Sequence, residues 1–127
     1  MSLINLIKII DRLVGGADND ELYGEADNDR LRGGSGEDIL CGGTGIDRVW
    51  GNAGADIFQV NVGDGKDIIK DFGRGDDRIQ LLTGTDVVDL TTFGSHVKVE
   101  HEGDLMAVIQ NISTAELDQN GAFIDLI

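Results

Sequence analysis

The 127-residue chain has no proline, one cysteine and few aromatic residues, and its 10 lysines and arginines face 24 aspartates and glutamates. A single cysteine excludes an intrachain disulfide. The net charge of −14 argues against nucleic acid or an anionic membrane surface as a partner. No apolar run is long enough to span a bilayer, and the opening MSLINLIKII lacks the basic region and cleavage site of a secretory signal peptide. Such an acidic, glycine-rich chain suits cations or a solvated, disordered state.

A nine-residue repeat runs through the first half of the chain. Aspartate recurs at every ninth position, at Asp11, Asp20, Asp29, Asp38, Asp47 and Asp56. An apolar residue follows two positions later, at Leu13, Leu22, Leu31, Leu40, Val49 and Phe58. A glycine opens each full unit, at Gly15, Gly24, Gly33, Gly42 and Gly51. Because three columns keep register, the pattern indicates a repeat architecture, and the length favours a single domain.

Each unit combines a glycine-rich turn with a very short strand. Its first six positions, of the type G-G-x-G-x-D, favour positive φ and tight turns. Position four is glycine in the later units but Asp18 and Asp27 in the first two, and aspartate also tolerates the left-handed region. The last three positions, such as ILC and RVW, suit a strand with one side chain inward. Such a strand is not stable alone, so the units must stack at a spacing of about 4.8 Å.

Glycine turns combined with a periodic acid predict calcium as the ligand. Calcium takes about six to eight oxygen ligands and accepts backbone carbonyls beside carboxylates. Magnesium prefers a tighter octahedron with retained waters, and zinc prefers cysteine and histidine. The spacing also differs from that of an EF-hand, which places its ligands within one loop.

The units resemble the G-G-x-G-x-D-x-U-x nonapeptide of the RTX (repeats-in-toxin) family, also called haemolysin-type calcium-binding repeats. The resemblance is close over residues 11–59 and continues through DGKDIIKDFGRGDDRIQL at residues 64–81, which looks like the family's closing segment. It implies an all-β fold, a right-handed parallel β-roll of stacked nonapeptides with two units in each turn. It also implies a calcium-binding module of a secreted, extracellular protein that leaves the cell by type I export, which would account for the missing N-terminal signal.

In such a roll, aspartates eighteen residues apart face each other across one ion. The expected pairs are Asp20 with Asp38, Asp38 with Asp56, Asp11 with Asp29, and Asp29 with Asp47. After a two-residue slip, Asp47 is expected to pair with Asp67, and Asp71 and Asp77 are expected to close the stack. The chain would then hold about three to five calcium ions.

The resemblance also implies backbone carbonyl ligands from both loops of each pair. They are Gly16, Asp18, Gly33 and Ser35 for Asp20–Asp38, Gly34, Gly36, Gly51 and Ala53 for Asp38–Asp56, Glu25, Asp27, Gly42 and Thr44 for Asp29–Asp47, and Gly43 and Gly45 ahead of Asp67. Glu25 stands where the family has glycine, as do Asp18 and Asp27, so side-chain ligation at these three positions is left open.

The sequence divides into three segments. Residues 1–14 are expected to cap the roll, either as a helix or as a first strand, and residues 15–80 to form the roll itself. Residues 81–127 are expected to form a C-terminal β cap that is also a candidate secretion signal. Within this cap, residues 96–102 alternate like a strand, residues 105–112 suit a buried strand, and Ser113 can open a one-turn helix.

A periodic array of acids provides no single reaction centre, so the sequence predicts a non-catalytic calcium-binding module. Two alternatives stay open, which are a polysaccharide-binding accessory module that follows an upstream catalytic domain, and an adhesin tail. Trp50 or Tyr23 could contact such a polymer, but the acidic balance argues against an acidic polysaccharide unless calcium bridges to it. Arg32 lies eighteen residues before Trp50 and is expected to form a cation–π contact with it.

Overall fold

The computed structural model describes residues 2–5, 12–61, 65–72, 77–81, 89–110 and 124–126, and within these ranges every regular element is a β-strand. The strands are β1 Ser2–Asn5, β2 Arg12–Gly16, β3 Asp20–Tyr23, β4 Arg30–Gly34, β5 Ile39–Cys41, β6 Ile46–Asn52, β7 Ile57–Val60, β8 Lys66–Ile69, β9 Arg78–Leu81, β10 Asp89–Phe93, β11 His96–His101, β12 Asp104–Ile109 and β13 Ile124–Leu126. The candidate ligand Asp11 and the predicted helix from Ser113 lie outside the described residues. Within those residues the chain has no helix suited to crossing a membrane.

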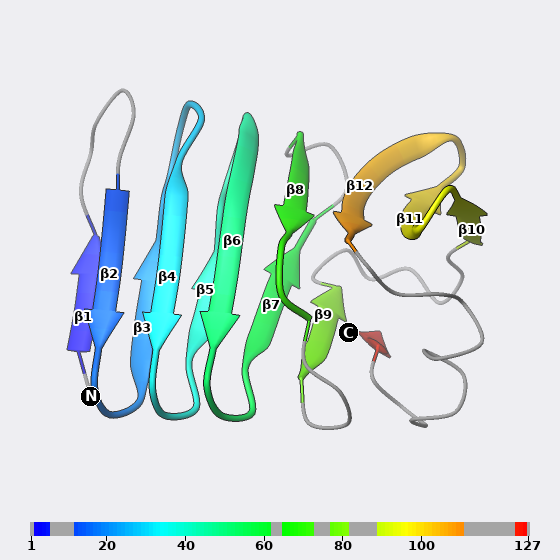
Figure 1. The fold of residues 1–127 in the computed structure, drawn as a ribbon. Coiled ribbons are helices and arrows are strands. Elements are labelled where there is room, and N and C mark those ends of the chain that lie inside the picture. Colours follow the sequence, from blue (N-terminus) through cyan, green and yellow to red (C-terminus); the bar gives the residue numbers. More distant parts are fainter. Residues whose placement is uncertain are drawn as a thin grey trace.

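The strands form two sheets, and the chain alternates between them from β1 to β9 (Figure 1). One sheet has the order β1-β3-β5-β7-β9-β13, and the other has the order β10-β11-β12-β8-β6-β4-β2. Neighbours within the repeats are parallel and eighteen residues apart, so that Arg30 lies opposite Arg48 and Ile39 lies opposite Ile57. Two nonapeptides therefore make one turn of a parallel β-roll, which confirms the fold predicted from the sequence.

The apolar column of the repeat fills the space between the two sheets. Its members are all at most 2% exposed, namely Leu13, Leu22, Leu31, Leu40, Val49 and Phe58. Successive side chains of a strand alternate between its faces, so each three-residue strand buries one of them. Burial of one such side chain contributes about 1.5–3 kcal/mol, so a stable core requires the stacked series.

The regular spacing ends after β7. Ile46 lies opposite Lys66, twenty residues later, and Ile57 lies opposite Arg78, twenty-one residues later. The chain therefore inserts two extra residues before β8 and one more between β8 and β9. The two-residue slip predicted before Asp67 is confirmed by this register.

The described C-terminal strands extend both sheets. Strands β10, β11 and β12 form an antiparallel meander, and β12 pairs in parallel with β8. The strands predicted at 96–102 and 105–112 correspond to β11 and β12, and buried Val97, Val99 and Met106 enlarge the core. Strand β13 pairs with β9, and β1 pairs with β3, so residues 2–5 form a strand rather than a helix. The capping roles assigned to residues 1–14 and 81–127 stay predictions.

The turns use the left-handed backbone region, as the unit pattern requires. Asp18 and Asp27 have φ values of 73° and 71°, so aspartate does replace glycine at position four. Glu25, at position two, is also left-handed, with φ of 72°. Glutamate is strained there, because a left-handed residue with a Cβ costs roughly 1–2 kcal/mol.

Candidate metal centre

The aspartates of the repeat form two buried columns, one at each side of the roll. In the first column the backbone N–H of each aspartate donates to Oδ1 of the aspartate in the next rung. The distances are 2.9 Å from Asp20 to Asp38, 3.0 Å from Asp38 to Asp56 and 2.8 Å from Asp56 to Asp77. All four side chains are at most 3% exposed. The column thus continues past the slip and ends in Asp77.

The second column follows the same rule. The N–H of Asp29 donates to Oδ1 of Asp47 at 2.8 Å, and Asp47 lies in register with Asp67. Asp29 is 1% exposed, Asp47 is fully buried and Asp67 is 7% exposed. Three of the pairs expected from the eighteen-residue spacing, and the shifted pair of Asp47 with Asp67, therefore lie in adjacent turns of the roll. The fourth expected pair, Asp11 with Asp29, includes a residue outside the described ones.

In the aspartates at the middle of each column, the second carboxylate oxygen, Oδ2, accepts no hydrogen bond. The Oδ2 atoms of Asp38, Asp47 and Asp56 are buried and accept no hydrogen bond. Desolvation raises the pKa of Asp38 above its ordinary 3.8, that of Asp47 to about 7 and that of Asp56 to about 8, and neighbouring aspartates add to each rise. A buried carboxylate in this state needs either a proton or a cation.

The opening glycine of each unit leaves room for these oxygens. A Cβ built on Gly33 would collide with Oδ2 of Asp38 and would lie 2.9 Å from the carbonyl oxygen of Gly51. A Cβ on Gly24 would lie 2.6 Å from Oδ2 of Asp29 and 2.7 Å from the carbonyl oxygen of Gly42. A carboxylate of one rung and a carbonyl of the next therefore converge on one point.

Gly15 shows the same convergence, with Oδ2 of Asp20 at 2.5 Å and the carbonyl oxygen of Gly33 at 2.7 Å from a Cβ placed there. These carbonyls, of Gly33, Gly42 and Gly51, are the ones that the resemblance implied for position one of the later loop. Position one must therefore be glycine because the carboxylate of its own unit folds against its α-carbon. Two oxygen atoms of different rungs meet there, which is a donor set that suits a hard cation.

The carbonyls at positions two and four point toward the following rung on the same side. A Cβ on Gly34 would clash with the carbonyl oxygen of Gly16, and a Cβ on Gly36 would clash with that of Asp18. The position-two carbonyls also accept interloop hydrogen bonds, from Ser35 N to Gly16 O and from Thr44 N to Glu25 O, both 2.9 Å. Each carbonyl oxygen has a second lone pair, so this bond leaves it able to face a cation.

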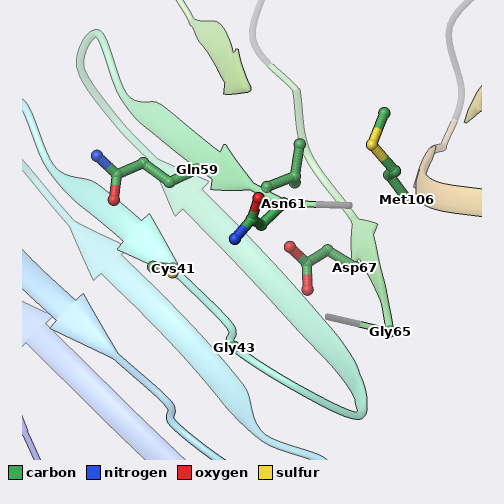
Figure 2. Close-up of a pocket in the computed structure, with 8 residues that line it drawn as sticks. Cys41, Gly43, Gln59, Asn61, Gly65, Asp67 and Met106 are labelled. Carbon is green, nitrogen blue, oxygen red and sulfur yellow. The ribbon is translucent and has the colours of Figure 1, made fainter. Parts of the chain in front are cut away.

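A small cavity lies beside Asp67, close to the point where the register shifts. Its volume is about 30 Å³, and Cys41, Gly43, Gln59, Val60, Asn61, Gly65, Asp67 and Met106 line it. Figure 2 shows this lining, which comes from strands β5, β7, β8 and β12 and the segments that follow β5 and β7. A space of this size holds one ion or one water molecule. Asp67 lines this cavity, whereas Asp47 does not.

The family model for the RTX calcium-binding nonapeptide repeat matches four copies of the unit, over residues 10–40 and 34–69. Residues 10–69 belong to the RTX family. A similar solved structure is the AlgE6R3 subunit from the Azotobacter vinelandii mannuronan C5-epimerase, at 22% identity and a TM-score of 0.60, with 96% of this chain and 80% of that chain covered. This solved structure has a similar fold. No curated protein sequence matches this chain.

RTX repeats bind calcium, and the oxygen-rich columns fit that ion. Within the described part of the chain no three histidine, cysteine, aspartate or glutamate side chains form a cluster that could hold a metal ion. The carboxylates stand in pairs instead, with backbone carbonyls beside them, and calcium is the cation that accepts such a mixture. The ligand role of each individual residue stays a prediction.

Several candidate ligands are placed differently from the buried aspartates. The side chains of Asp18, Glu25 and Asp27 are exposed, so only their backbone carbonyls face the stack. Asp71 accepts hydrogen bonds from Gly51 N at 2.8 Å and Asn52 N at 2.9 Å. Its carboxylate therefore holds the last two residues of β6, and a calcium at Asp71 stays a prediction.

Sequence reasoning missed a second set of links between the RTX loops. Oδ1 of Asn19 accepts a hydrogen bond from Glu37 N at 2.7 Å, and Oδ1 of Asn28 accepts one from Ile46 N at 2.8 Å. Both asparagines occupy position five of their units, where "ADND" occurs twice. This repeated tetrapeptide was the available signal, because an amide at one turn position can reach a backbone N–H eighteen residues later.

Proposed function

We propose that this chain is a non-catalytic module whose roll assembles around calcium ions held between consecutive rungs. The observation that carries the proposal is the buried series of Oδ2 atoms, at Asp38, Asp47 and Asp56, that accept no hydrogen bond. Each faces the α-carbon of a glycine. A calcium ion at each point would neutralise two carboxylates and accept the adjacent carbonyl oxygens. Asp38 would then serve two ions, one shared with Asp20 and one shared with Asp56.

Charge repulsion explains why the ion is needed for folding. Two carboxylates about 5.5 Å apart repel by roughly 3 kcal/mol at an effective dielectric near 20. The columns contain several such neighbours, and each nonapeptide contributes only one fully buried apolar side chain. Without cations the repulsion exceeds what the short strands offset, so the repeat segment stays disordered.

Calcium levels would then make folding depend on the compartment. Extracellular modules bind calcium at about 10⁻⁴–10⁻³ M, far above cytosolic levels. One site contributes about 1.4 kcal/mol when calcium stands tenfold above its dissociation constant. The chain would therefore stay unfolded before export and fold outside the cell. Export by type I secretion, with the C-terminal segment as its signal, belongs to this proposal.

A calcium titration followed by circular dichroism tests the folding role. The chain starts in excess chelator, and magnesium is titrated in a matched sample as the control. We expect a strand signal that rises cooperatively with calcium and stays absent with magnesium. A full strand signal in chelator, or an equal response to magnesium, would contradict the proposal.

A further inference from the structure

The part of one outer sheet face that β2, β4, β6 and β8 form carries outward-pointing cations and no outward-pointing acid. Here we call this surface the arginine face. Side chains that alternate with the core point outward from these strands and from the residue after β8. They include six of the chain's ten lysines and arginines, namely Arg12, Arg30, Arg32, Arg48, Lys66 and Lys70. The other outward positions are Val14, Gly16, Gly34, Ile46, Trp50, Asn52 and Ile68, so no carboxylate is among them.

Register places three of these arginines in one row. Arg12 lies opposite Arg30, and Arg30 lies opposite Arg48, all three exposed. Adjacent strands are about 4.8 Å apart, so the row brings like charges close together. Within the described residues no ion pair compensates these arginines. Like charges directly opposite each other destabilise a sheet, so folding alone gives no reason for the row.

A parallel row beside the arginines adds an aromatic surface. Val14 lies opposite Arg32, and Arg32 lies opposite Trp50. The Arg32 guanidinium lies 4.5 Å from the centre of the Trp50 ring, which confirms the cation–π contact expected from the sequence. Val14 is 52% exposed, and Ile46 on the same face is 41% exposed. Cations, one aromatic ring and apolar side chains thus share one flat surface.

From this arrangement we propose that the arginine face binds a linear, carboxylated polysaccharide. Guanidinium groups pair with carboxylates through two parallel hydrogen bonds, and the strand spacing is close to the length of one sugar ring in an extended chain. Trp50 and the apolar side chains suit the C–H surfaces of sugar rings. The net charge of −14 does not oppose such a polymer at this face, because the acids lie elsewhere on the chain.

A thin polymer fits this face better than a broad partner does. The turns at both ends of the strands carry exposed acids, with Asp18 and Glu37 on one side and Glu25 and Asp27 on the other. A nucleic acid duplex or a globular acidic protein would meet these turns, whereas a single extended chain can cross the strands between them. At physiological salt charges act over about 8 Å, so the face and the turns are screened from each other in part.

Trp50 provides a direct probe, because it is the only tryptophan of the chain. The calcium-saturated chain is titrated with short oligogalacturonates while tryptophan fluorescence is followed, and neutral dextran is the blank. The test variant is Arg30→Gln/Arg48→Gln, which also removes like-charge repulsion and should keep the fold. The control is Arg78→Gln, on β9 of the opposite sheet. Circular dichroism in calcium confirms that each variant has the wild-type strand signal.

We expect saturable binding that weakens as salt rises, a loss of about tenfold in affinity for the double variant, and less than twofold for Arg78→Gln. Absence of binding by folded wild-type chain, or equal binding by the double variant, would overturn the proposal. Equal binding of dextran sulfate or a thymidine oligonucleotide would overturn the assignment to carboxylated sugar. Concentration-dependent dimers in sedimentation that the double variant abolishes, without oligogalacturonate binding, would assign the face to a second copy instead.

Discussion

Replacement of Asp38 by asparagine separates the hydrogen-bonding role of the side chain from its charge. The asparagine Oδ1 can still accept the 2.9 Å hydrogen bond from Asp20 N, so the backbone link between rungs is kept. The negative charge that two ions would share is lost. The matched comparison is Asp77→Asn, whose side chain accepts the corresponding bond from Asp56 N but ends its column.

The expected loss of stability in each variant follows from the number of calcium ions that the replaced carboxylate would bind. At tenfold excess of calcium over its dissociation constant, loss of two sites removes about 2.8 kcal/mol and loss of one removes about 1.4 kcal/mol. In chelator Asp38→Asn should instead be the more stable variant. It removes the repulsion of Asp38 with both neighbouring aspartates, each roughly 3 kcal/mol at most. We therefore expect Asp38→Asn to raise the calcium midpoint more than Asp77→Asn does, and to show more strand in chelator than wild type.

Calcium titrations by circular dichroism on the three proteins, with urea unfolding at fixed calcium, measure both effects. Equal midpoints for the two variants would refute the idea of a carboxylate shared between rungs. A lower strand signal of Asp38→Asn in chelator would refute the repulsion argument.

Three further predictions concern the turns and the titration of the columns. Gly33→Ala should raise the calcium midpoint about tenfold, because its Cβ would displace Oδ2 of Asp38. Ser35→Ala should change the midpoint less than twofold, and equal effects of the two variants would contradict the close packing of Asp38 against Gly33. Glu25→Gly should stabilise the calcium-loaded roll by roughly 0.5 kcal/mol in urea unfolding, because relief of the left-handed backbone strain exceeds the added entropy of the unfolded chain. Glu25→Gln is the control for loss of charge, and no gain in stability over this control would contradict the strain argument. In chelator, strand content should fall as pH rises toward 8, because the pKa of Asp47 is raised to about 7 and that of Asp56 to about 8. Protonation of these two carboxyl groups stabilises the metal-free fold fully below about pH 4, and this stabilisation is lost as the pH rises through 7 to 8. A strand signal that grows with pH would contradict this prediction.

The roll itself could be predicted because the repeat fixes both register and burial. A strict nine-residue step places Leu22, Leu31 and Leu40 on one inward stripe, and two units per turn bring residues eighteen apart into adjacent rungs. Strict alternation likewise located β11. These features depend on local spacing alone, so a sequence without its structure is sufficient to find them.

The features that could not be predicted depend on which chain segments meet in space. Pairing of β12 with β8 joins residues about forty positions apart, and no period in the sequence indicates it. The hydrogen bonds that Asp71 accepts from the N–H groups of Gly51 and Asn52 could not be predicted either, because they join residues that the nine-residue period does not bring into register. The arginine face appears only when outward positions of alternate strands are assembled into one sheet.

The most direct test of the account is a crystal structure of the chain grown with calcium. We expect ions between Asp20 and Asp38, between Asp38 and Asp56, and between Asp29 and Asp47, at about 2.3–2.6 Å from carboxylate and carbonyl oxygens. Rungs that stack with the same spacing but hold no ion between these aspartates would contradict it.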